Sequence, residues 1–266
     1  MGAGRMGGAL VKGWVAQKLT SIVAVEPAPS PDMRDLARRH AIRLVANIED
    51  ALDLRVSACV IALKPQILRA HGERLKPIAA SGALMVSIAA GTSIAGLRKS
   101  WGRQASIVRA MPNTPGSIGH GITALYAPPS ISPALRARAE TLVAGLGQTF
   151  WVGREALIDA VTAVSGSGPA YVFLMAECLS KAARKQGFSA DIAAKLARAT
   201  VSGAGALLDA DTRDPSALRR DVMSPGGTTE AALGILIKDS ALETLMTDAV
   251  SAARARAQEL RRQSEN

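Results

Sequence analysis

Short apolar runs alternate with amphipathic stretches along the first part of the chain. The runs predict β-strands and the periodic stretches predict helices. The expected strands are residues 22–25, 42–45, 58–63, 84–88, 106–110, 121–126 and 148–152, and the expected helices include residues 30–40, 48–52 and 132–146. A continuous apolar run is typical of a parallel strand buried on both faces. The alternation therefore predicts an α/β unit with a doubly wound parallel sheet.

The pattern changes at about Glu155, where strand signals end and alanine-rich helical periodicity begins. Helix starts and ends are marked in order by Gly168-Pro169, Gly187, Ser189 and Asp214-Pro215, before a last amphipathic stretch at residues 241–262. We therefore expect two domains, an α/β domain over residues 1–154 and an all-α domain over residues 155–266. The apolar faces at residues 171–175 and 199–208 are broad enough to predict a partner surface.

Composition narrows the class of protein. The 266 residues are 48% hydrophobic, with a net charge of +10 that raises nucleic acid as a partner. The basic residues are scattered and aromatic residues are only 3%, so we interpret the charge as solvated helix faces. Cys59 and Cys178 are too few for a disulfide framework, and no spacing suggests a metal site. No signal peptide or membrane-length apolar run is found, so a cytoplasmic protein is expected.

The first candidate site is a glycine turn at the start of the chain. Gly2, Gly4 and Gly7 have the G-x-G-x-x-G spacing that lets a backbone turn approach a pyrophosphate closely. The turn is normally preceded by the central strand of a Rossmann-type sheet, and Met1 could supply only its last residue. We expect an incomplete N-terminus; a wrongly recorded start, or a sheet built without that strand, are the alternatives.

Polar residues follow several predicted strands. Glu26 comes directly after the strand at residues 22–25, where an acidic side chain can accept hydrogen bonds from ribose hydroxyls. Its alternative role is a solvated loop carboxylate. Lys64 and Asn113 follow two further strands, at the sheet edge where open α/β sheets bind ligands.

The second candidate site is the stretch from Ser224 to Leu233, with the sequence SPGGTTEAAL. Gly226 and Gly227 let the backbone approach a ligand, and the apolar run that follows predicts a helix. A helix start presents free N–H groups and the positive end of a dipole. The stretch therefore predicts a small-anion site, with a carboxylate as the expected ligand. The alternative is a glycine turn with a threonine cap.

The chain resembles the pyrroline-5-carboxylate reductases in six motifs that occur in the family's order. These motifs are residues 2–7, 62–65, 87–91, 109–115, 165–171 and 224–233. The resemblance implies a Rossmann-type domain followed by a helical dimerisation domain, a homodimer, and often a ring of dimers. It also implies reduction of 1-pyrroline-5-carboxylate to L-proline with NADPH or NADH, the last step of proline biosynthesis.

The resemblance also assigns roles to residues. Cofactor binding is expected of Gly2, Gly4, Arg5, Met6, Gly7, Glu26, Ala62, Lys64, Pro65, Ala89 and Asn113. Substrate binding is expected of Ser224, Gly226, Gly227, Thr228 and Thr229, with Thr229 as the catalytic residue that hydrogen-bonds the ring nitrogen. Glu26 departs from members that prefer NADPH, because a carboxylate would repel a 2′-phosphate. A related cyclic imine or ketimine reductase, and a non-catalytic cofactor-binding relative, are the alternative functions.

Overall fold

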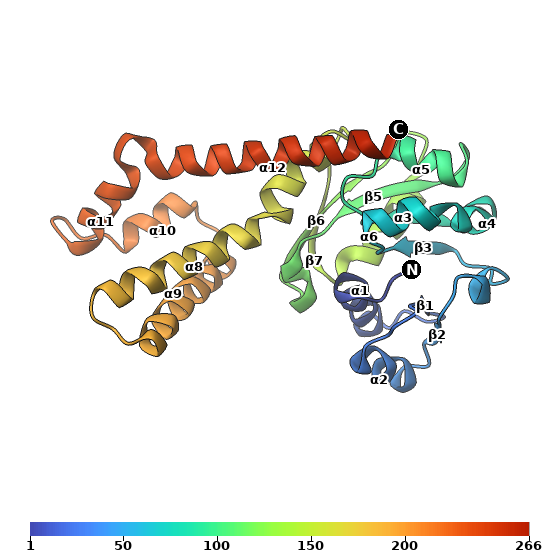
Figure 1. Ribbon diagram of the computed structural model, residues 1–266, viewed down its shortest axis with the longest axis horizontal. Helices are drawn as coiled ribbons and strands as arrows, with labels where there is room; N and C mark the ends of the chain where they lie inside the picture. The colour runs from blue at the N-terminus through green and yellow to red at the C-terminus, as the bar shows by residue number, and fades with distance from the viewer. Residues whose placement is uncertain (266) are drawn as a thin grey trace. The chain divides into compact units, whose positions relative to one another are not determined.

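The computed structural model describes residues 1–265 (Figure 1). The chain divides into two compact units. The sheet unit comprises Met1–Ser167 together with the chain from Ala252 onward, and the helical unit comprises Gly168–Ser251. The sheet unit thus extends past the boundary expected at residue 155, and it also includes the end of the last helix, from Ala252.

The sheet unit contains strands in two ladders. Strands β1 (Val23–Val25) and β2 (Arg43–Val45) pair in parallel. The larger ladder has the order β3 (Ala58–Ile61), β4 (Leu84–Ser87), β5 (Ile107–Met111), β6 (Gly121–Tyr126) and β7 (Gly147–Trp151). The helices of the unit are α1 (Arg5–Ala16), α2 (Pro31–Arg39), α3 (Pro65–His71), α4 (Lys76–Ala80), α5 (Ile94–Trp101), α6 (Pro133–Ala144) and α7 (Leu157–Val161).

Both faces of the larger sheet are covered, as a doubly wound architecture requires. On one face Met85 and Ile107 pack with Trp101 of α5, and on the other Val86 and Val108 pack against α1 and α6. All four residues of β4 are buried. These buried strands confirm the expected α/β class, because only strands covered on both faces can be apolar throughout.

One pairing differs from the parallel sheet expected from the sequence. β5 and β6 are antiparallel, with Ala110 opposite Leu125, whereas β3–β4, β4–β5 and β6–β7 are parallel. The connection from β5 to β6 contains only the 3₁₀ turn Thr114–Ile118. A parallel crossover needs a dozen or more residues, so this short connection reverses the chain direction.

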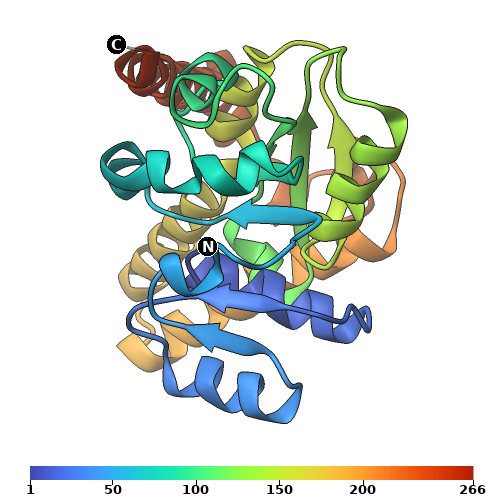
Figure 2. The ribbon, with the colours of Figure 1, turned by 90° about the vertical axis from the view of Figure 1, so that its right-hand side faces the viewer.

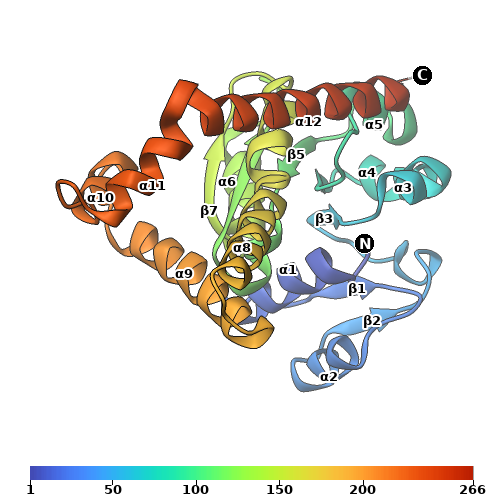
Figure 3. The ribbon, with the colours of Figure 1, turned by 60° about the vertical axis from the view of Figure 1, so that its left-hand side comes forward.

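A group of buried charges ties the last residues of the chain to the sheet unit. The Arg109 guanidinium on β5 is 3.0 Å from a Glu155 carboxylate oxygen, and Arg261 is 2.9 Å from Asp159. Figures 1 and 3 show the C-terminal end of α12 (Ala241–Glu265) beside α5, where the Ser93 amide donates to the Ser264 hydroxyl. These contacts place residues 155–167 and the chain from Ala252 in the sheet unit.

The helical unit contains α8 (Gly168–Lys185), α9 (Ala190–Ala210), α10 (Pro215–Asp221), α11 (Thr228–Ile237) and the first part of α12. The expected helix start at Gly168 and the Ser189 cap are confirmed, since the Ser189 hydroxyl accepts from the Ile192 amide. α8 packs along α9, and large apolar side chains of the unit remain exposed. They include Phe173, Leu174, Leu207, Ile235 and Leu245, each more than half exposed.

By length and composition, one helical segment of the described chain could cross a membrane. It is Leu157–Lys185, with a mean hydropathy of 1.3. No apolar run of that length was expected from the sequence, and the charged residues Asp159, Glu177 and Lys181 lie within the segment.

Candidate active site

The glycine turn forms the start of α1 and joins the two ladders of the sheet unit. The Gly2 amide donates to the Val25 carbonyl at 2.9 Å, and the Ala62 amide donates to the Met1 carbonyl at 2.8 Å. Gly4 is the N-cap, so the first N–H groups of α1, from Arg5 onward, have no acceptor within the helix. These groups and the positive end of the helix dipole lie at the carboxyl edge of β1 and β3, and such an arrangement is typical of anion sites.

Each glycine of the turn answers a different physical requirement. Gly2 has φ +81°, and a Cβ there would lie 2.8 Å from the Ala62 carbonyl oxygen. A Cβ on Gly7 would lie 1.8 Å from the Gly2 carbonyl oxygen, so Gly7 permits the close packing of helix and turn. A Cβ on Gly4 would meet nothing within 4 Å. Gly4 therefore leaves open space in front of the helix start, as a pyrophosphate requires.

Glu26 lies beside this turn at the end of β1. One carboxylate oxygen accepts from the Ala3 amide at 2.9 Å and the other from the Ala28 amide at 3.2 Å. The two bonds fix the carboxylate, and each oxygen keeps acceptor capacity for a further donor. The structure thus places Glu26 where a ribose hydroxyl next to the glycine turn can reach it, rather than in a free loop.

The other predicted cofactor residues lie at the same edge of the sheet. Ala62 and Lys64 follow β3, with Lys64 exposed as the N-cap of α3 and Pro65 as its first residue. Ala89 follows β4 and is buried, with its amide near the Ser87 hydroxyl. Because β1, β3, β4 and β5 are parallel, their carboxyl ends meet at one edge (Figure 2). Within the turn itself, Arg5 is exposed and Met6 is half-buried.

Asn113 belongs to the same edge but has a structural task as well. It is the N-cap of the turn after β5, and its side-chain oxygen accepts from the Ile122 amide at 3.0 Å. That bond fixes the reversal between β5 and β6. Only the amide nitrogen of the Asn113 side chain is left to donate to a ligand. The sequence could not reveal this division of roles.

The second candidate site is at the start of α11, in the helical unit. Gly226 has φ +68°, a conformation that side chains rarely adopt, and Gly227 is the N-cap of the helix. A Cβ on Gly227 would lie 2.4 Å from the Ser224 hydroxyl oxygen, so the loop is closed tightly around that hydroxyl. The structure therefore brings Ser224, Gly226 and Gly227 together as expected.

The Gly226 and Gly227 amides, which are expected to bind a ligand, already have acceptors in this structure. The Gly226 amide donates to the Glu230 carboxylate at 2.6 Å, and the Gly227 amide donates to the Ser224 carbonyl at 2.9 Å. The amides in the first turn of α11, those of Thr228, Thr229 and Glu230, have no acceptor within the helix, whose first bond runs from the Ala231 amide to the Gly227 carbonyl. They, and not the two glycine amides, are the donors available to an anion.

The geometry at the start of α11 bears on the alternative that a threonine caps this helix. Gly227 is the N-cap, so neither Thr228 nor Thr229 caps the helix with its hydroxyl. Both are the first residues inside α11, and Thr229 is half-buried while Thr228 is exposed. The Glu230 carboxylate accepts from the Gly226 amide, which precedes the N-cap.

Two family models match separate parts of the chain, and curated relatives match nearly all of it. The model described as pyrroline-5-carboxylate reductase dimerisation matches residues 155–260, and one described as NADP oxidoreductase, coenzyme F420-dependent, matches residues 1–91. A pyrroline-5-carboxylate reductase of Pseudomonas aeruginosa is 38% identical over 99% of this chain and 96% of its own length. The chain belongs to the pyrroline-5-carboxylate reductase family.

Solved structures of pyrroline-5-carboxylate reductases have the same fold. The Coxiella burnetii protein superposes with a TM-score of 0.86 at 33% identity, covering 97% of this chain and 96% of its own. The Plasmodium falciparum protein, solved with NADP bound, gives a TM-score of 0.80 at 27% identity, covering 98% of this chain and 96% of its own. The expected Rossmann-type domain followed by a helical dimerisation domain is confirmed.

Several residues around the two sites were missed by sequence reasoning. The Arg109 side chain is 2% exposed and Glu155 accepts from it and from the Ile94 amide at 2.7 Å. Burial lowers the pKa of Arg109, and the Glu155 carboxylate opposes that shift. The sequence placed Glu230 in a motif but did not predict its bond with the Gly226 amide.

Among residues 1–265, no cluster of three His, Cys, Asp or Glu side chains could hold a metal ion.

Proposed function

We propose that the protein reduces the ring C=N of 1-pyrroline-5-carboxylate to give L-proline, with hydride from NADH or NADPH. The proposal rests on the family match over nearly the whole chain. It rests also on two local features, the glycine turn at residues 2–7 and the loop at residues 224–227 before α11, which we call the anion loop. When bound, the nicotinamide supplies the hydride. The protein holds, orients and screens the reactants.

The sheet unit fits the adenosine diphosphate part of the cofactor. The open space in front of Gly4 and the free amides from Arg5 onward match a pyrophosphate. Glu26 would accept from the ribose hydroxyls, while Lys64, Ala89 and Asn113 would lie toward the nicotinamide. Because Glu26 is held in place by two amides, its charge would oppose a 2′-phosphate, and NADH is the favoured cofactor.

The helical unit fits the substrate carboxylate. The free amides of Thr228 and Thr229 at the start of α11 would bind it, and the Ser224 hydroxyl would add a hydrogen bond. The Thr229 hydroxyl would donate or accept at the ring nitrogen as the imine becomes an amine. No side chain is assigned as a general acid, since an imine that arrives protonated needs only positioning and electrostatic stabilisation.

The assembly follows from the dimerisation domain. Residues 155–260 match that domain, and large apolar side chains on α8, α9 and α11 remain exposed. We propose a homodimer formed by these faces, a ring of dimers as the larger assembly, and a cytoplasmic location without membrane attachment. The segment Leu157–Lys185 would then be covered by the partner subunit and not by lipid.

The decisive test is oxidation of NADH and of NADPH in the presence of racemic 1-pyrroline-5-carboxylate, with L-proline identified by chiral chromatography. A six-membered cyclic imine carboxylate is the matched second substrate. Turnover that is faster with the five-membered ring supports the proposal. Preference for the larger ring would identify a related imine reductase, and cofactor binding without turnover of either ring would identify a non-catalytic relative.

A further inference from the structure

The connection from β4 to α5, residues 88–93, belongs to the cofactor edge of the sheet unit and carries Ala89. We call it loop 88–93. It contains no helix or strand, yet all of its residues are buried or half-buried. A connection without its own hydrogen-bond ladder keeps one conformation only where neighbouring elements hold it. The contacts that hold this loop come from distant parts of the sequence.

The first end of loop 88–93 is fixed at the sheet. The chain leaves β4 at Ser87, which is paired in register with Arg109 of β5. The Ile88 amide then donates to the Ile61 carbonyl of β3 at 3.0 Å. The loop therefore begins directly beside the buried guanidinium of Arg109, whose charge requires a partner in the interior.

The second end of the loop is fixed by Glu155. The Ile94 amide, the first of α5, donates to Oε1 of Glu155 at 2.7 Å, and the Arg109 guanidinium donates to the same oxygen at 3.0 Å. One carboxylate oxygen thus ties the second end of the loop to the residue beside its first end. Hydrogen bonds to an ionised carboxylate are strong, and its charge also suits the start of a helix.

The middle of the loop packs closely on the end of α12. Gly91 has φ +65°, and a Cβ there would lie 2.8 Å from the Cβ of Leu260. The Ser93 amide also donates to the Ser264 hydroxyl at 3.4 Å. Loop 88–93 therefore has no room to shift toward α12, and its position depends on how its two ends are held.

We propose that Glu155 is a positioning residue for the nicotinamide end of the cofactor. The inference rests on the proposed function, in which Ala89 lies toward the nicotinamide. Glu155 acts through the Ile94 amide, which fixes loop 88–93 and with it the place of Ala89. A nicotinamide that is displaced loses its alignment with the imine carbon, and a misplacement of about 1 Å can cost about a hundredfold in rate.

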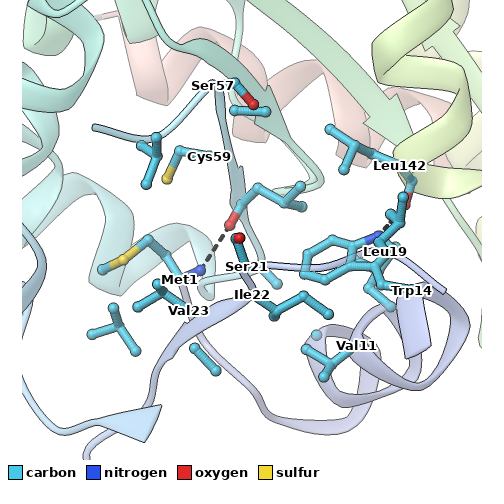
Figure 4. Close-up of a pocket in the computed structure, with 18 of the residues that line it drawn as sticks. Met1, Val11, Trp14, Leu19, Ser21, Ile22, Val23, Ser57, Cys59 and Leu142 are labelled. Carbon is cyan, nitrogen blue, oxygen red and sulfur yellow. Dashed lines mark hydrogen bonds between the residues drawn. The ribbon is translucent and has the colours of Figure 1, made fainter. Parts of the chain in front are cut away.

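The adenosine end of the cofactor is supported by other contacts. The glycine turn is held by backbone hydrogen bonds to β1 and to the residue after β3. Helix α1 is held by Trp14, whose indole N–H donates to the Leu142 carbonyl at 2.7 Å (Figure 4). These contacts involve neither Glu155 nor Arg109. A change at Glu155 should therefore weaken binding of the whole cofactor and leave binding of its adenosine part unchanged.

The test measures the Kd of NADH and of ADP-ribose, which lacks the nicotinamide, by titration calorimetry. A wild-type protein that binds only NADPH is tested with NADPH and 2′-phospho-ADP-ribose. The Tm and the kcat for the imine are measured alongside.

Two variants remove the tie in different ways. Arg109→Met/Glu155→Met removes it and leaves neither charge of the pair buried alone. Glu155→Asp keeps the charge beside Arg109 and withdraws the oxygen from the Ile94 amide by one methylene. Glu140→Met is the matched control, because the Glu140 carboxylate also joins two elements of the sheet unit, by accepting from the Thr149 hydroxyl at 2.9 Å.

In the double variant the Kd of NADH is expected to rise about tenfold and kcat to fall at least about tenfold, while the Kd of ADP-ribose changes by less than about twofold. Glu155→Asp should show the same split at about three- to tenfold. Glu140→Met is expected to change neither Kd.

Equal losses for NADH and ADP-ribose would overturn the proposal, because they would show general damage to the sheet unit. Unchanged values of Kd and kcat in both Glu155 variants would overturn it too, as would a wild-type protein that binds neither NADH nor NADPH. A wild-type protein that binds the cofactor without reducing the imine contradicts the proposed function instead. The split between the two Kd values then still decides the role of Glu155.

Discussion

Removal of Arg261 tests how the end of α12 is held in the sheet unit. Arg261 is 26% exposed and its guanidinium lies 2.9 Å from an oxygen of Asp159, whose side chain is only 2% exposed. Arg261→Met keeps most of the length of the side chain and removes its charge. The Asp159 carboxylate is then left buried without its ion-pair partner.

The magnitude follows from that burial. Breaking a buried pair by removal of one partner costs about 3–5 kcal/mol, because the remaining charge is uncompensated. For a protein of this size each kcal/mol shifts the Tm by about 2–4 °C, so a decrease of about 6–20 °C is expected. The double variant Arg261→Met/Asp159→Asn is expected to recover more than half of the loss, since it removes the buried charge as well.

Scanning calorimetry at one fixed protein concentration measures the effect, because association makes the Tm concentration-dependent. Arg256→Met is the matched control on the same helix: its pair with Glu259 is exposed, and a change of less than about 1 kcal/mol is expected. Hydrogen exchange of α5 should rise in Arg261→Met and stay unchanged in the control. A single variant as stable as the control would refute the argument that this pair anchors α12.

Three further changes test the sites and the core. Glu26→Ser is expected to improve kcat/KM for NADPH relative to NADH, measured by steady-state kinetics; a wild-type protein that strongly prefers NADPH would contradict the role of Glu26. Thr229→Val should lower kcat/KM for the imine about ten- to a hundredfold, from a loss of roughly 1.5–3 kcal/mol, with unchanged cofactor Kd. Normal turnover in that variant with a lower Tm would exclude the catalytic role. Thr123→Val should stabilise the protein by about 1 kcal/mol in urea unfolding, because among residues 1–265 the buried Thr123 hydroxyl has no hydrogen-bond partner; a decrease in stability would show that the hydroxyl is satisfied.

The strands could be predicted because strands buried on both faces are continuous apolar runs in the sequence. Ala58–Ile61 and Leu84–Ser87 are apolar along their length, and only a position covered on both faces tolerates that pattern. Apolar periodicity did not reveal the direction of β6, because that direction depends on the length of the connection after β5. The charges of Arg109 and Asp159 look like surface residues in sequence, and only the fold shows that they pair in the interior.

The candidate sites could be predicted less completely than the fold. Gly2, Gly7 and Gly226 stand where the backbone geometry requires glycine, so the sequence itself indicates these positions. The partners of individual amides are not indicated in this way. Whether the Gly226 amide faces a ligand or the Glu230 carboxylate depends on a side chain four residues away adopting one conformation. That choice is made by the folded loop alone.

The contact between Glu230 and Gly226 orders the anion loop and also places a negative charge beside it. A carboxylate at a helix start interacts favourably with the dipole, and here it also satisfies the amide of a residue held at φ +68°. The loop is thus ordered by its own side chain before any ligand binds, which reduces the entropy lost on binding. The same negative charge lowers the attraction for a second carboxylate. A substrate anchored only by charge would therefore bind weakly at this loop. Under the proposed function, its recognition would depend on directed hydrogen bonds from the Thr228 and Thr229 amides and from the threonine hydroxyls.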